Sequence, residues 1–446
     1  MTSGIPGKLT LHTIGSFFAI LTITALAGPA ATTARAQESG ALIDALVRKG
    51  ILASEEAAGI RAALAAENQA AAPQPPPAAR RNSRVSFMSR MQFQYANLET
   101  TDRDGINSTP RVSHFLVRRF YLGVKADAGE NFTLECVYDI AGEYFDRACV
   151  RWVGNIGGAP FAFDLGVRKT SFGYEEYTSS GVIKTIERSG VTRYFANEVN
   201  GRILGSTCNR VGIFADYNPA AFARKTTGFF AGAALTNPER VNTPSGIVSI
   251  GGNDTNMLAL WANAGFNGKS GAASWIAGAA TAYLPGQGGV NDTVGAGTRG
   301  CNLAQGSIYA DLTLARLNLA AEYLLAKVDK GRDGVADATI RGFWIQPSVK
   351  FNNHWEAVVR YSHTDTDGRG IRVSDGVRSA RSLGDASVTA CVLHEYYIGL
   401  TYYLAGVEAK IQCGYVGGRT SGACAAGGVL NEETVSGFRT QVQVSF

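Results

Sequence analysis

The last nine residues of the chain read Phe438-Arg439-Thr440-Gln441-Val442-Gln443-Val444-Ser445-Phe446. Side chains of a β-strand point alternately to its two faces, so every second residue lies on the same side. In this segment one face carries phenylalanine, valine and threonine, and the other carries arginine, glutamine and serine. The segment therefore predicts a strand with one apolar and one polar face that ends on an aromatic residue, Phe446.

The same alternation begins near Arg84 and recurs along the chain. Residues 85–95 are mostly apolar at odd positions, whereas the even positions include Arg90, Gln92 and Gln94. Such a face is too polar for the core of a soluble sheet, but it suits a water-filled lumen. About sixteen strand candidates begin near residues 84, 115, 131, 144, 161, 210, 226, 256, 273, 307, 318, 339, 355, 394, 407 and 435. Because weak strands are easily missed, eighteen strands is the alternative count.

The connections between these candidates differ in length. The long ones span residues 97–113, 170–209, 238–255, 285–306, 329–338, 364–393 and 417–434, and Ala141-Gly142-Glu143 is an example of a tight turn. Long loops on one side and short periplasmic turns on the other are typical of transmembrane barrels. A terminal phenylalanine on an alternating strand also resembles the C-terminal signature of outer-membrane barrels. We therefore predict an all-β fold, a transmembrane antiparallel β-barrel of about 16 strands over residues 84–446.

Residues 1–36 have the features of a secretory signal peptide. Lys8 supplies the positive region, Ile14–Ala27 is largely apolar, and Ala34-Arg35-Ala36 is a cleavage motif. The apolar run is shorter than the roughly 20 residues that a membrane anchor needs. We expect the mature chain to begin at Gln37, and an exported chain without a helical span is expected in the outer membrane of a Gram-negative cell.

Residues 37–72 are predicted to form a short helical, coiled-coil-like segment in the periplasm, with Ser54 capping its second helix. The proline-rich stretch that follows, residues 73–83, is an extended linker. The first interpretation of the helical segment is a solvated spacer. The alternative is a contact with the cell wall, or a role in oligomerisation, through residues 39–68.

The composition excludes several functions. The chain has 42 basic and 37 acidic residues, and removal of Lys8 and Arg35 with the signal leaves 40 minus 37, or +3. This balance excludes a polybasic nucleic-acid binder, so any electropositive function depends on where charges are placed. Seven cysteines is an odd number, so at least one thiol is free or paired between chains. No metal, cofactor or catalytic motif is recognisable, and no enzyme activity is expected.

Several segments resemble the phosphate-selective porin O and P family of outer-membrane porins. They are the double-arginine strand Arg118–Gly123, the block Gly166–Ser180, the glutamate-arginine pair in Ile186–Arg188, and the strand His394–Leu404. Thr170 departs from the family pattern, which has proline there. The resemblance implies a homotrimeric porin in outer-membrane lipid that passes small hydrophilic solutes passively.

The family layout implies that the loop at 170–209 folds into the barrel and narrows it. Positive groups at a narrow place favour anions, and arginine forks and lysine charges suit phosphate or polyphosphate. The expected channel and anion-binding residues are Arg119, Lys125, Arg168, Lys169, Lys184, Arg188, Arg193 and Arg202. Arg118 is two residues from the apolar Phe120 and would share its face of the strand, so Arg118 is expected at a strand end. The competing interpretation is that these residues are wall charges paired with acids such as Glu135 or Asp164.

Other functions fit the same barrel. The first alternative is a general or sugar-passing porin. Two alternatives belong to other classes: a barrel enzyme of the lipase type, and a structural anchor whose pore is plugged. No serine, histidine and aspartate follow a recognisable catalytic order, which disfavours the enzyme.

Two further expectations concern particular residues. Cys136 and Cys149 should not be bonded, because the register that keeps one strand face apolar pairs Leu134 with Trp152 and sends the two thiols to opposite faces. Arg439, on the last strand, is expected to lie far from the constriction.

Overall fold

The computed structural model describes residues 47–49, 53–71, 84–102, 111–196, 204–238, 242–243, 246–247, 257–286, 302–332, 336–378, 390–424 and 432–446. By its contacts the chain divides into two units, Met1–Arg80 and Arg81–Phe446. The expected signal segment and the proline-rich linker lie outside the described residues.

Helix α3 (Ser54–Ala71) is the main described element of the first unit. The N–H of Ala53 donates to Oε2 of Glu56 at 3.1 Å, so Ala53 holds the capping position. Ser54 is the first helical residue, and the expectation that it caps the helix is wrong by one position. Among the described residues no helix is long and apolar enough to cross a membrane.

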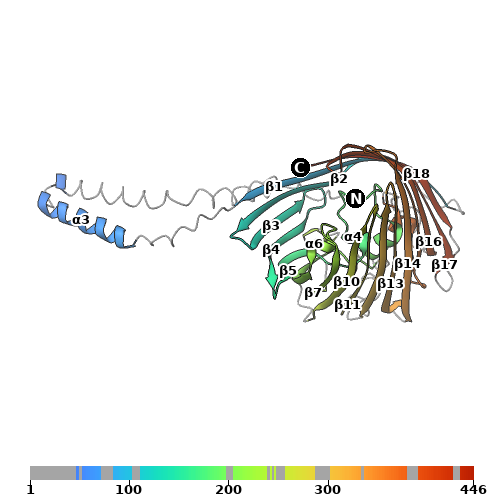
Figure 1. Cartoon of the computed structure of the whole chain (residues 1–446), viewed down its shortest axis with the longest axis horizontal. Helices are drawn as coiled ribbons and strands as arrows, with labels where there is room; N and C mark the ends of the chain where they lie inside the picture. The colour runs from blue at the N-terminus through green and yellow to red at the C-terminus, as the bar shows by residue number, and fades with distance from the viewer. Residues whose placement is uncertain are drawn as a thin grey trace, which may run out of the picture. The chain divides into compact units, whose positions relative to one another are not determined.

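In the second unit, sixteen described strands close into one antiparallel barrel, which confirms the predicted fold class and strand number (Figure 1). Their bounds are β1 (Val85–Asp102), β2 (Arg111–Ala128), β3 (Phe132–Asp139), β4 (Tyr144–Ile156), β5 (Ala159–Lys169), β6 (Asn209–Tyr217), β7 (Gly228–Thr236), β10 (Ala259–Ser270), β11 (Ala273–Leu284), β12 (Leu303–Leu314), β13 (Leu317–Arg332), β14 (Ala336–Lys350), β15 (Trp355–Asp365), β16 (Ala390–Ala405), β17 (Ala409–Ala423) and β18 (Glu433–Ser445). A pair of two-residue strands, β8 (Asn242–Thr243) and β9 (Gly246–Ile247), forms a separate sheet.

Strands β1 and β18 close the barrel. The N–H of Ser89 donates to the carbonyl oxygen of Phe446 at 2.9 Å, and the N–H of Phe446 donates to the carbonyl oxygen of Ser89 at 3.0 Å. The terminal aromatic residue thus takes part in the closing hydrogen bonds. A closed barrel leaves no unpaired sheet edge, which is the condition for a β-structure in hydrocarbon.

The two faces of the strands separate as the alternation predicts. On β18 the side chains of Phe438 and Val442 are exposed, as is that of Phe446 directly after it, whereas Arg439 and Gln441 on the other face are buried inside the barrel. The outward apolar face suits lipid, and the inward face forms the wall of the lumen.

The turn Ala141–Glu143 joins β3 to β4, as predicted. It lies at the same end of the barrel as the long connection after β5, because β3 and β5 run in the same direction. The expectation that the short turns lie at the opposite end is therefore wrong for this turn. The connection expected at 329–338 is also shorter, because β13 and β14 extend into it.

Cys136 and Cys149 are both free, as predicted, but the expected register between their strands is wrong. Leu134 pairs with Val150, two positions away from Trp152. Because a shift of two residues preserves the faces, Cys149 still points inward and is buried.

Two other cysteines form a disulfide that the sequence did not indicate. Cys391, at the start of β16, is bonded to Cys424, just after β17. The bond joins neighbouring strands at the barrel end where the long loops lie. The hydroxyl of Thr366, directly after β15, donates to the carbonyl oxygen of Cys391 at 2.8 Å. This bond attaches the start of the connection after β15 beside the disulfide.

Candidate functional site

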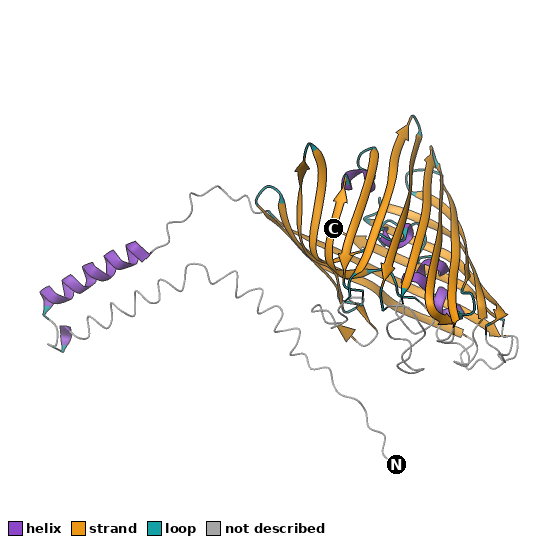
Figure 2. Cartoon of the chain, turned by 90° about the horizontal axis from the view of Figure 1, so that it is seen from below, coloured by secondary structure: helices purple, strands orange, loops and turns teal. Residues whose placement is uncertain are grey.

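The described residues of the connection between β5 and β6, 170–196 and 204–208, fold into the barrel; we call them the inner loop. Its short helices, α4 (Tyr174–Tyr177) and α5 (Gly190–Ala196), lie within the ring of strands (Figure 2). The loop forms hydrogen bonds with β1, β13 and β18, which are distant from β5 around the ring. The described part of the loop therefore narrows the barrel as predicted.

A buried carboxylate attaches α4 to the wall. Glu322 on β13 accepts hydrogen bonds from the backbone N–H groups of Tyr174 and Glu175, at 2.6 and 3.2 Å. The first N–H groups of a helix have no partner within it, so the carboxylate supplies one. Ser307 on β12 also donates to Glu322, at 2.6 Å.

Helix α5 packs on an apolar stretch of the wall. Val191, Tyr194 and Phe195 are buried in one cluster with side chains of β10 to β14, among them Trp261 and Ile340. The lumen wall is therefore not polar throughout, contrary to what the strand pattern indicated. Burial of a large apolar side chain stabilises by about 1.5–3 kcal/mol, so this contact is a principal anchor of the inner loop.

Arg360 on β15 connects the inner loop to two strands of the wall. Its Nη1 donates to Oε1 of Glu175 and to the carbonyl oxygen of Glu187, at 2.9 and 2.8 Å. Its Nη2 donates to Oε1 of Glu395 on β16 at 2.9 Å. A buried guanidinium requires ionised partners, and two carboxylates provide them.

Glutamine side chains hold the loop backbone after α4. Gln92 on β1 donates to the carbonyl oxygen of Ser180, and Gln443 on β18 donates to that of Gly181, both at 3.0 Å. The same two amides also bond to each other, at 2.7 Å. The polar face of the terminal strands thus binds the loop that fills the lumen.

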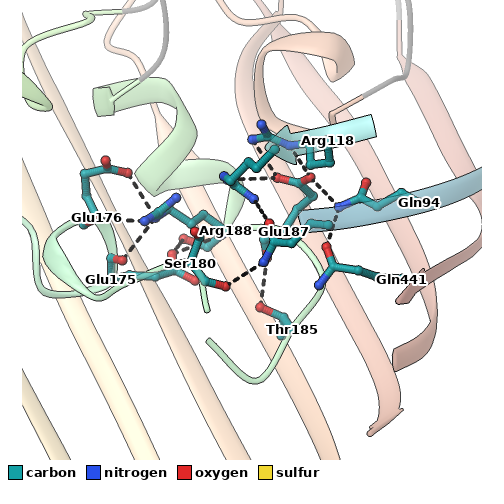
Figure 3. A network of polar contacts seen from close by, with 12 residues as sticks. Gln94, Arg118, Glu175, Glu176, Ser180, Thr185, Glu187, Arg188 and Gln441 are labelled. Carbon is teal, nitrogen blue, oxygen red and sulfur yellow. Dashed lines mark hydrogen bonds and ion pairs between the residues drawn. The ribbon is translucent and has the colours of Figure 1, made fainter. Parts of the chain in front are cut away.

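Glu187 is the carboxylate at the centre of the next network (Figure 3). Nε and Nη2 of Arg118 donate to its two oxygens at 2.6 and 3.2 Å, and Nε2 of Gln94 donates at 3.0 Å. Nη2 of Arg119 lies 4.0 Å from Oε2. Burial acts to raise the pKa of Glu187, but Arg118 and Arg119 outweigh it and hold the pKa well below its usual range. Glu187 is therefore an anion held by a fork of two N–H groups.

Arg118 and Arg119 both reach the lumen because β2 has a β-bulge. Arg119 lies opposite Gln92 on β1 and Val117 lies opposite Phe93, so Arg118 is the extra residue. A bulge places two residues against one and re-aims a side chain. The expectation that Arg118 lies on the apolar face is wrong. Assigning every second residue to the same face holds only where the strand has no bulge.

Three more arginines face Glu187. Arg193 comes from α5, Arg378 follows α7 (Val373–Gly376), and Arg439 comes from β18. We call the five residues the arginine cluster: Arg118, Arg119, Arg193, Arg378 and Arg439. The expectation that Arg439 lies far from the constriction is wrong, because the loop after β15 and the inner loop both fold against the last strand.

The charges of the arginine cluster oppose one another. Repulsion from Arg118, together with burial, lowers the pKa of Arg378 well below its usual value. Burial lowers the pKa of Arg193 to about 10. Besides Glu187, three acids act on members of the cluster: Asp375 on Arg193, Asp139 on Arg118 and Arg119, and Glu395 on Arg439. The five arginines thus outnumber these four acids by one. The cluster carries an excess of positive charge inside the barrel.

The predicted residues on β5 form ion pairs with acids. Arg168 contacts Asp164, and its Nη1 lies 2.5 Å from Oδ2 of Asp216. Nζ of Lys169 lies 2.9 Å from Oε1 of Glu176 in the inner loop. The competing interpretation, that these are wall charges with acidic partners, holds for Arg168 and its partner Asp164.

Two predicted residues of the inner loop are also paired. Nζ of Lys184 lies 2.7 Å from Oε1 of Glu356 on β15. Arg188 lies 3.0 Å from Oε2 of Glu176 and donates to the carbonyl oxygens of Glu175 and Thr178. Both side chains fix the shape of the loop.

The remaining predictions have mixed outcomes. Arg119 and Arg193 belong to the arginine cluster. Lys125 is exposed near the end of β2, opposite Ser86, away from Glu187. Arg202 lies outside the described residues. Across the described ranges no group of histidine, cysteine, aspartate and glutamate is placed to hold a metal ion.

Four arginines that face the inner loop were not among the expected channel residues: Arg118, Arg360, Arg378 and Arg439. The polar face of β18 could have indicated that Arg439 points inward, and the double-arginine motif could have indicated the same for Arg118. Arg360 lies on an alternating strand, but nothing in the sequence shows that the inner loop reaches it. Arg378 lies in a long connection whose inward folding the strand pattern does not encode.

Comparisons with known proteins agree with this architecture. Residues 85–242 match the family described as phosphate-selective porin O and P, a range that runs from β1 through β7 and includes the inner loop. No curated protein matches the chain significantly.

Two solved structures show the likeness in fold. An anion-selective porin from Comamonas acidovorans is 14% identical, with a TM-score of 0.50, over 82% of this chain and 100% of that one. OprB of Pseudomonas putida is 11% identical, with a TM-score of 0.53, over 81% of this chain and 94% of that one. The chain thus has the fold of the outer-membrane porins, and the resemblance of its N-terminal strands to the phosphate-selective porin O and P family is confirmed.

Proposed function

We propose that the chain forms an outer-membrane channel through which small hydrophilic solutes diffuse, with a preference for anions. The observation that carries this proposal is the arginine cluster, five guanidinium groups facing the carboxylate of Glu187 inside the barrel. Charged groups at a narrow place replace part of the hydration of an ion. Their attraction is stronger in this partly desolvated site than in bulk water.

Phosphate is the leading candidate solute in this proposal. Arginine forks bind oxyanions through two parallel N–H groups, and Arg118 already binds a carboxylate in this way. The description of the matching family supports the same solute. In this proposal Arg118 and Arg119 meet the anion, whereas Lys169, Lys184 and Arg188 keep the inner loop in place.

A general porin is the second candidate. Most basic side chains of the lumen outside the arginine cluster are paired with acids, as Arg168 is with Asp164 and Lys184 is with Glu356. Paired charges select weakly, because the fields of the two partners largely cancel at a distance. The two candidates therefore differ in whether the arginine cluster or the paired wall governs permeation.

Block of chloride current by phosphate tests the proposal. In a planar bilayer, the full-length channel should lose chloride current as phosphate is added. The Arg118→Gln/Arg119→Gln variant should need a severalfold higher phosphate concentration. The matched control is Arg111→Gln, on the same strand, where an exposed arginine pairs with Glu99. Equal block of all three proteins would favour the general porin.

The assembly is also part of the proposal. We propose a homotrimer whose mature chain begins at Gln37. Unheated electrophoresis of the purified protein should show a species of three times the monomer mass, and mass spectrometry should give the N-terminus. A monomer in every mild detergent would contradict the trimer.

A further inference from the structure

A row of basic side chains lies on the outer surface of the barrel, at the end where the long loops lie. Lys327 on β13, Arg341 on β14 and Arg419 on β17 are 62, 62 and 57% exposed. His363 on β15 and His394 on β16 lie between them on the same face of the sheet and are half-buried. We call these five residues the outer basic row; the strands that carry them, β13 to β17, are consecutive neighbours in the ring (Figure 1).

Strand pairing brings the outer basic row together. His363 lies directly opposite His394, and His394 lies directly opposite Arg419. Arg341 lies opposite the residue two positions after His363, and Lys327 lies opposite the residue two positions before Arg341. Since neighbouring strands are about 4.8 Å apart, the row extends over about 20 Å of the surface.

Aromatic side chains lie directly below the outer basic row. They occupy the same outward face, two or four residues closer to the middle of each strand, and they are Tyr323, Phe343, Tyr361, Tyr396 and Tyr415. The ring centroids of Phe343 and Tyr361 are 5.9 Å apart, and the hydroxyl of Tyr361 is 2.7 Å from Nδ1 of His394. Tyrosine collects at the membrane–water interface, where its ring meets hydrocarbon and its hydroxyl meets water. The outer basic row therefore lies at the level of the lipid headgroups.

The cations of the row keep hydrogen-bonding capacity for a ligand. Nε and Nη2 of Arg341 both contact a single oxygen, Oδ2 of Asp365, at 3.2 and 3.0 Å. Arg419 contacts Oε2 of Glu432 through Nη2, at 2.6 Å. A guanidinium has five N–H donors, and exposed ion pairs of this kind contribute little stability. A phosphate group can therefore share these arginines with their carboxylates, or replace the carboxylates, at little cost.

Acids within the row decide which kind of anion suits it. Asp337, Asp365 and Glu432 each pair with one of the three cations, so the row has no net charge when its histidines are neutral. A single small anion gains little there, because an attracting and a repelling group lie at similar distances from it. A headgroup with more than one phosphate group can place each of them beside a different cation.

The apolar surface below the row fits the rest of a lipid. On β14 and β16 the outward face continues from Phe343 and Tyr396 to Ile345 and Ile398, which are exposed. A lipid bound at the row would place phosphate beside guanidinium groups and acyl chains against aromatic and aliphatic side chains. Methylene groups gain free energy on such a surface, whereas a soluble oxyanion uses only the polar contacts.

The outer basic row is confined to one side of the barrel. At the same end, the outward side chains at the ends of β3, β7 and β11 are the apolar or aromatic Ile140, Leu235 and Tyr283, all of them exposed. The row is therefore a local feature of β13 to β17 and marks one place on the outer surface.

We propose that the outer basic row binds a phosphorylated lipid of the outer leaflet, with its phosphate groups on Lys327, Arg341 and Arg419 and its acyl chains along the aromatic side chains below. Long loops of outer-membrane barrels lie on the external side, so the headgroups at this level are those of the outer leaflet. The inference goes beyond the proposed function, because it names a lipid partner and does not depend on the anion preference of the pore.

Native mass spectrometry of the purified full-length channel tests the proposal, in neutral detergent with diphosphoryl lipid A added. The lipid should stay bound to the wild type, and lipid A without its phosphate groups should not. In Arg341→Gln/Arg419→Gln the apparent dissociation constant should rise by about tenfold, since basic groups at headgroup level attract anionic lipid. Conductance and reversal potential of this variant should equal those of the wild type, which shows that the barrel is folded.

Opposite charge changes at one ion pair separate lipid binding from structure. Arg341→Gln should weaken binding of lipid A. Asp365→Asn should strengthen it severalfold, because it removes the carboxylate that competes with the lipid phosphate for Arg341. The matched control is Arg111→Gln, an exposed arginine at the same end of the barrel on β2, paired with Glu99 outside the row; it should leave lipid binding unchanged.

Several outcomes would overturn the proposal. They are equal binding of lipid A with and without its phosphate groups, binding that survives the loss of Arg341 and Arg419, and changes in the same direction for Arg341→Gln and Asp365→Asn. Displacement of the lipid by inorganic phosphate would assign the row to free oxyanions and would also refute lipid binding. None of these outcomes bears on the anion preference of the pore, which the reversal potential tests separately.

Discussion

At the residue scale, one carboxylate organises the positive charge of the lumen. Glu187 on the inner loop binds a guanidinium fork on β2, and the bulge that adds Arg118 turns this side chain toward it. Without the bulge, alternation would allow only Arg119 to face inward. The excess charge of the arginine cluster therefore depends on a local irregularity of one strand.

Replacement of Glu187 by glutamine should make the channel more anion-selective. The substitution keeps an acceptor for Arg118 but removes the acid that all five arginines face. The ratio of chloride to potassium permeability should rise roughly two- to tenfold, since about 1.4 kcal/mol corresponds to tenfold. Reversal potential in a potassium chloride gradient measures it. Glu99→Gln, at an exposed ion pair, is the control, and a shift of Glu187→Gln toward cations would refute the role of the cluster.

Individual site residues were only partly predictable from the sequence. Arg119 was identified because it lies in a motif that resembles a family, and Arg193 because it lies in the loop that the family layout folds inward. Arg118 was assigned to the wrong face. One extra residue exchanges the two strand faces beyond it, and the amino-acid composition does not show where such a bulge lies. Arg439 was misplaced because its neighbours in space come from two loops whose inward folding is a property of tertiary packing.

At the element scale, the inner loop is held by buried ion pairs as much as by its apolar face. Arg360 alone contacts Glu175, Glu187 and Glu395. Glu322 and the glutamines of β1 and β18 hold the preceding turn. A loop with so many attachments should behave as a fixed part of the pore.

Replacement of Arg360 by glutamine should release the inner loop. Two buried carboxylates would lose their partner, which costs about 3–5 kcal/mol when one side of a buried pair is removed. We expect noisy or enlarged single-channel currents and faster proteolysis of the loop, with the barrel still migrating as a folded band. Arg341→Gln, at an exposed pair with Asp365, should change neither. Quiet currents in Arg360→Gln would contradict this account.

Acid should loosen the inner loop in a defined range of pH. Burial acts to raise the pKa of Glu176, but Arg188 and Lys169 outweigh it and lower the pKa from 4.5 to about 2. A carboxyl with a depressed folded pKa stabilises the fold above its unfolded pKa and loses that contribution as pH falls through the folded pKa. Single-channel currents should be unchanged from pH 7 to about pH 5 and become noisy between about 4.5 and 2.

The control for the acid prediction is Glu176→Gln. This variant lacks the titrating group, so its currents should show much less change over the same range. A transition centred near neutral pH in the wild type would contradict the assignment to Glu176.

Strands were the most predictable elements, because alternation is imposed by the two solvents that their faces meet. The period of two located β1 and β18 and the residues of each face correctly. The apolar lumen wall that receives α5 was not predictable in the same way. Inward apolar side chains such as Trp261 and Ile340 look like any strand residue until the loop that covers them is known.

At the scale of the whole molecule, the strand pairing that closes the barrel lies entirely within the second unit. β1 pairs with β18 through a continuous register from Arg90 to Asp102, and the unit from Arg81 to Phe446 has its own core and lumen. Each described contact of the arginine cluster lies within this unit. We therefore predict that the pore forms without the first unit.

Removal of residues 37–80 should leave a channel with unchanged conductance and selectivity, because the closing strands and the inner loop are retained. The truncated and full-length proteins would be compared as single channels in the same bilayer. Failure of the truncated protein to fold or conduct would show that the first unit belongs to the working channel. Lower yield in cells with normal conductance would instead assign it a role in assembly.

The central claim is that placed charge, not net charge, sets the preference of the pore. The formal net charge of the 446-residue chain is only +5, so a uniformly charged wall would select weakly. The most direct measurement is the reversal potential of the wild-type channel in a potassium chloride gradient, beside Arg118→Gln/Arg119→Gln. We expect an anion-selective wild type whose preference falls severalfold in the variant. A cation-selective wild type, or a variant with the same reversal potential, would contradict it.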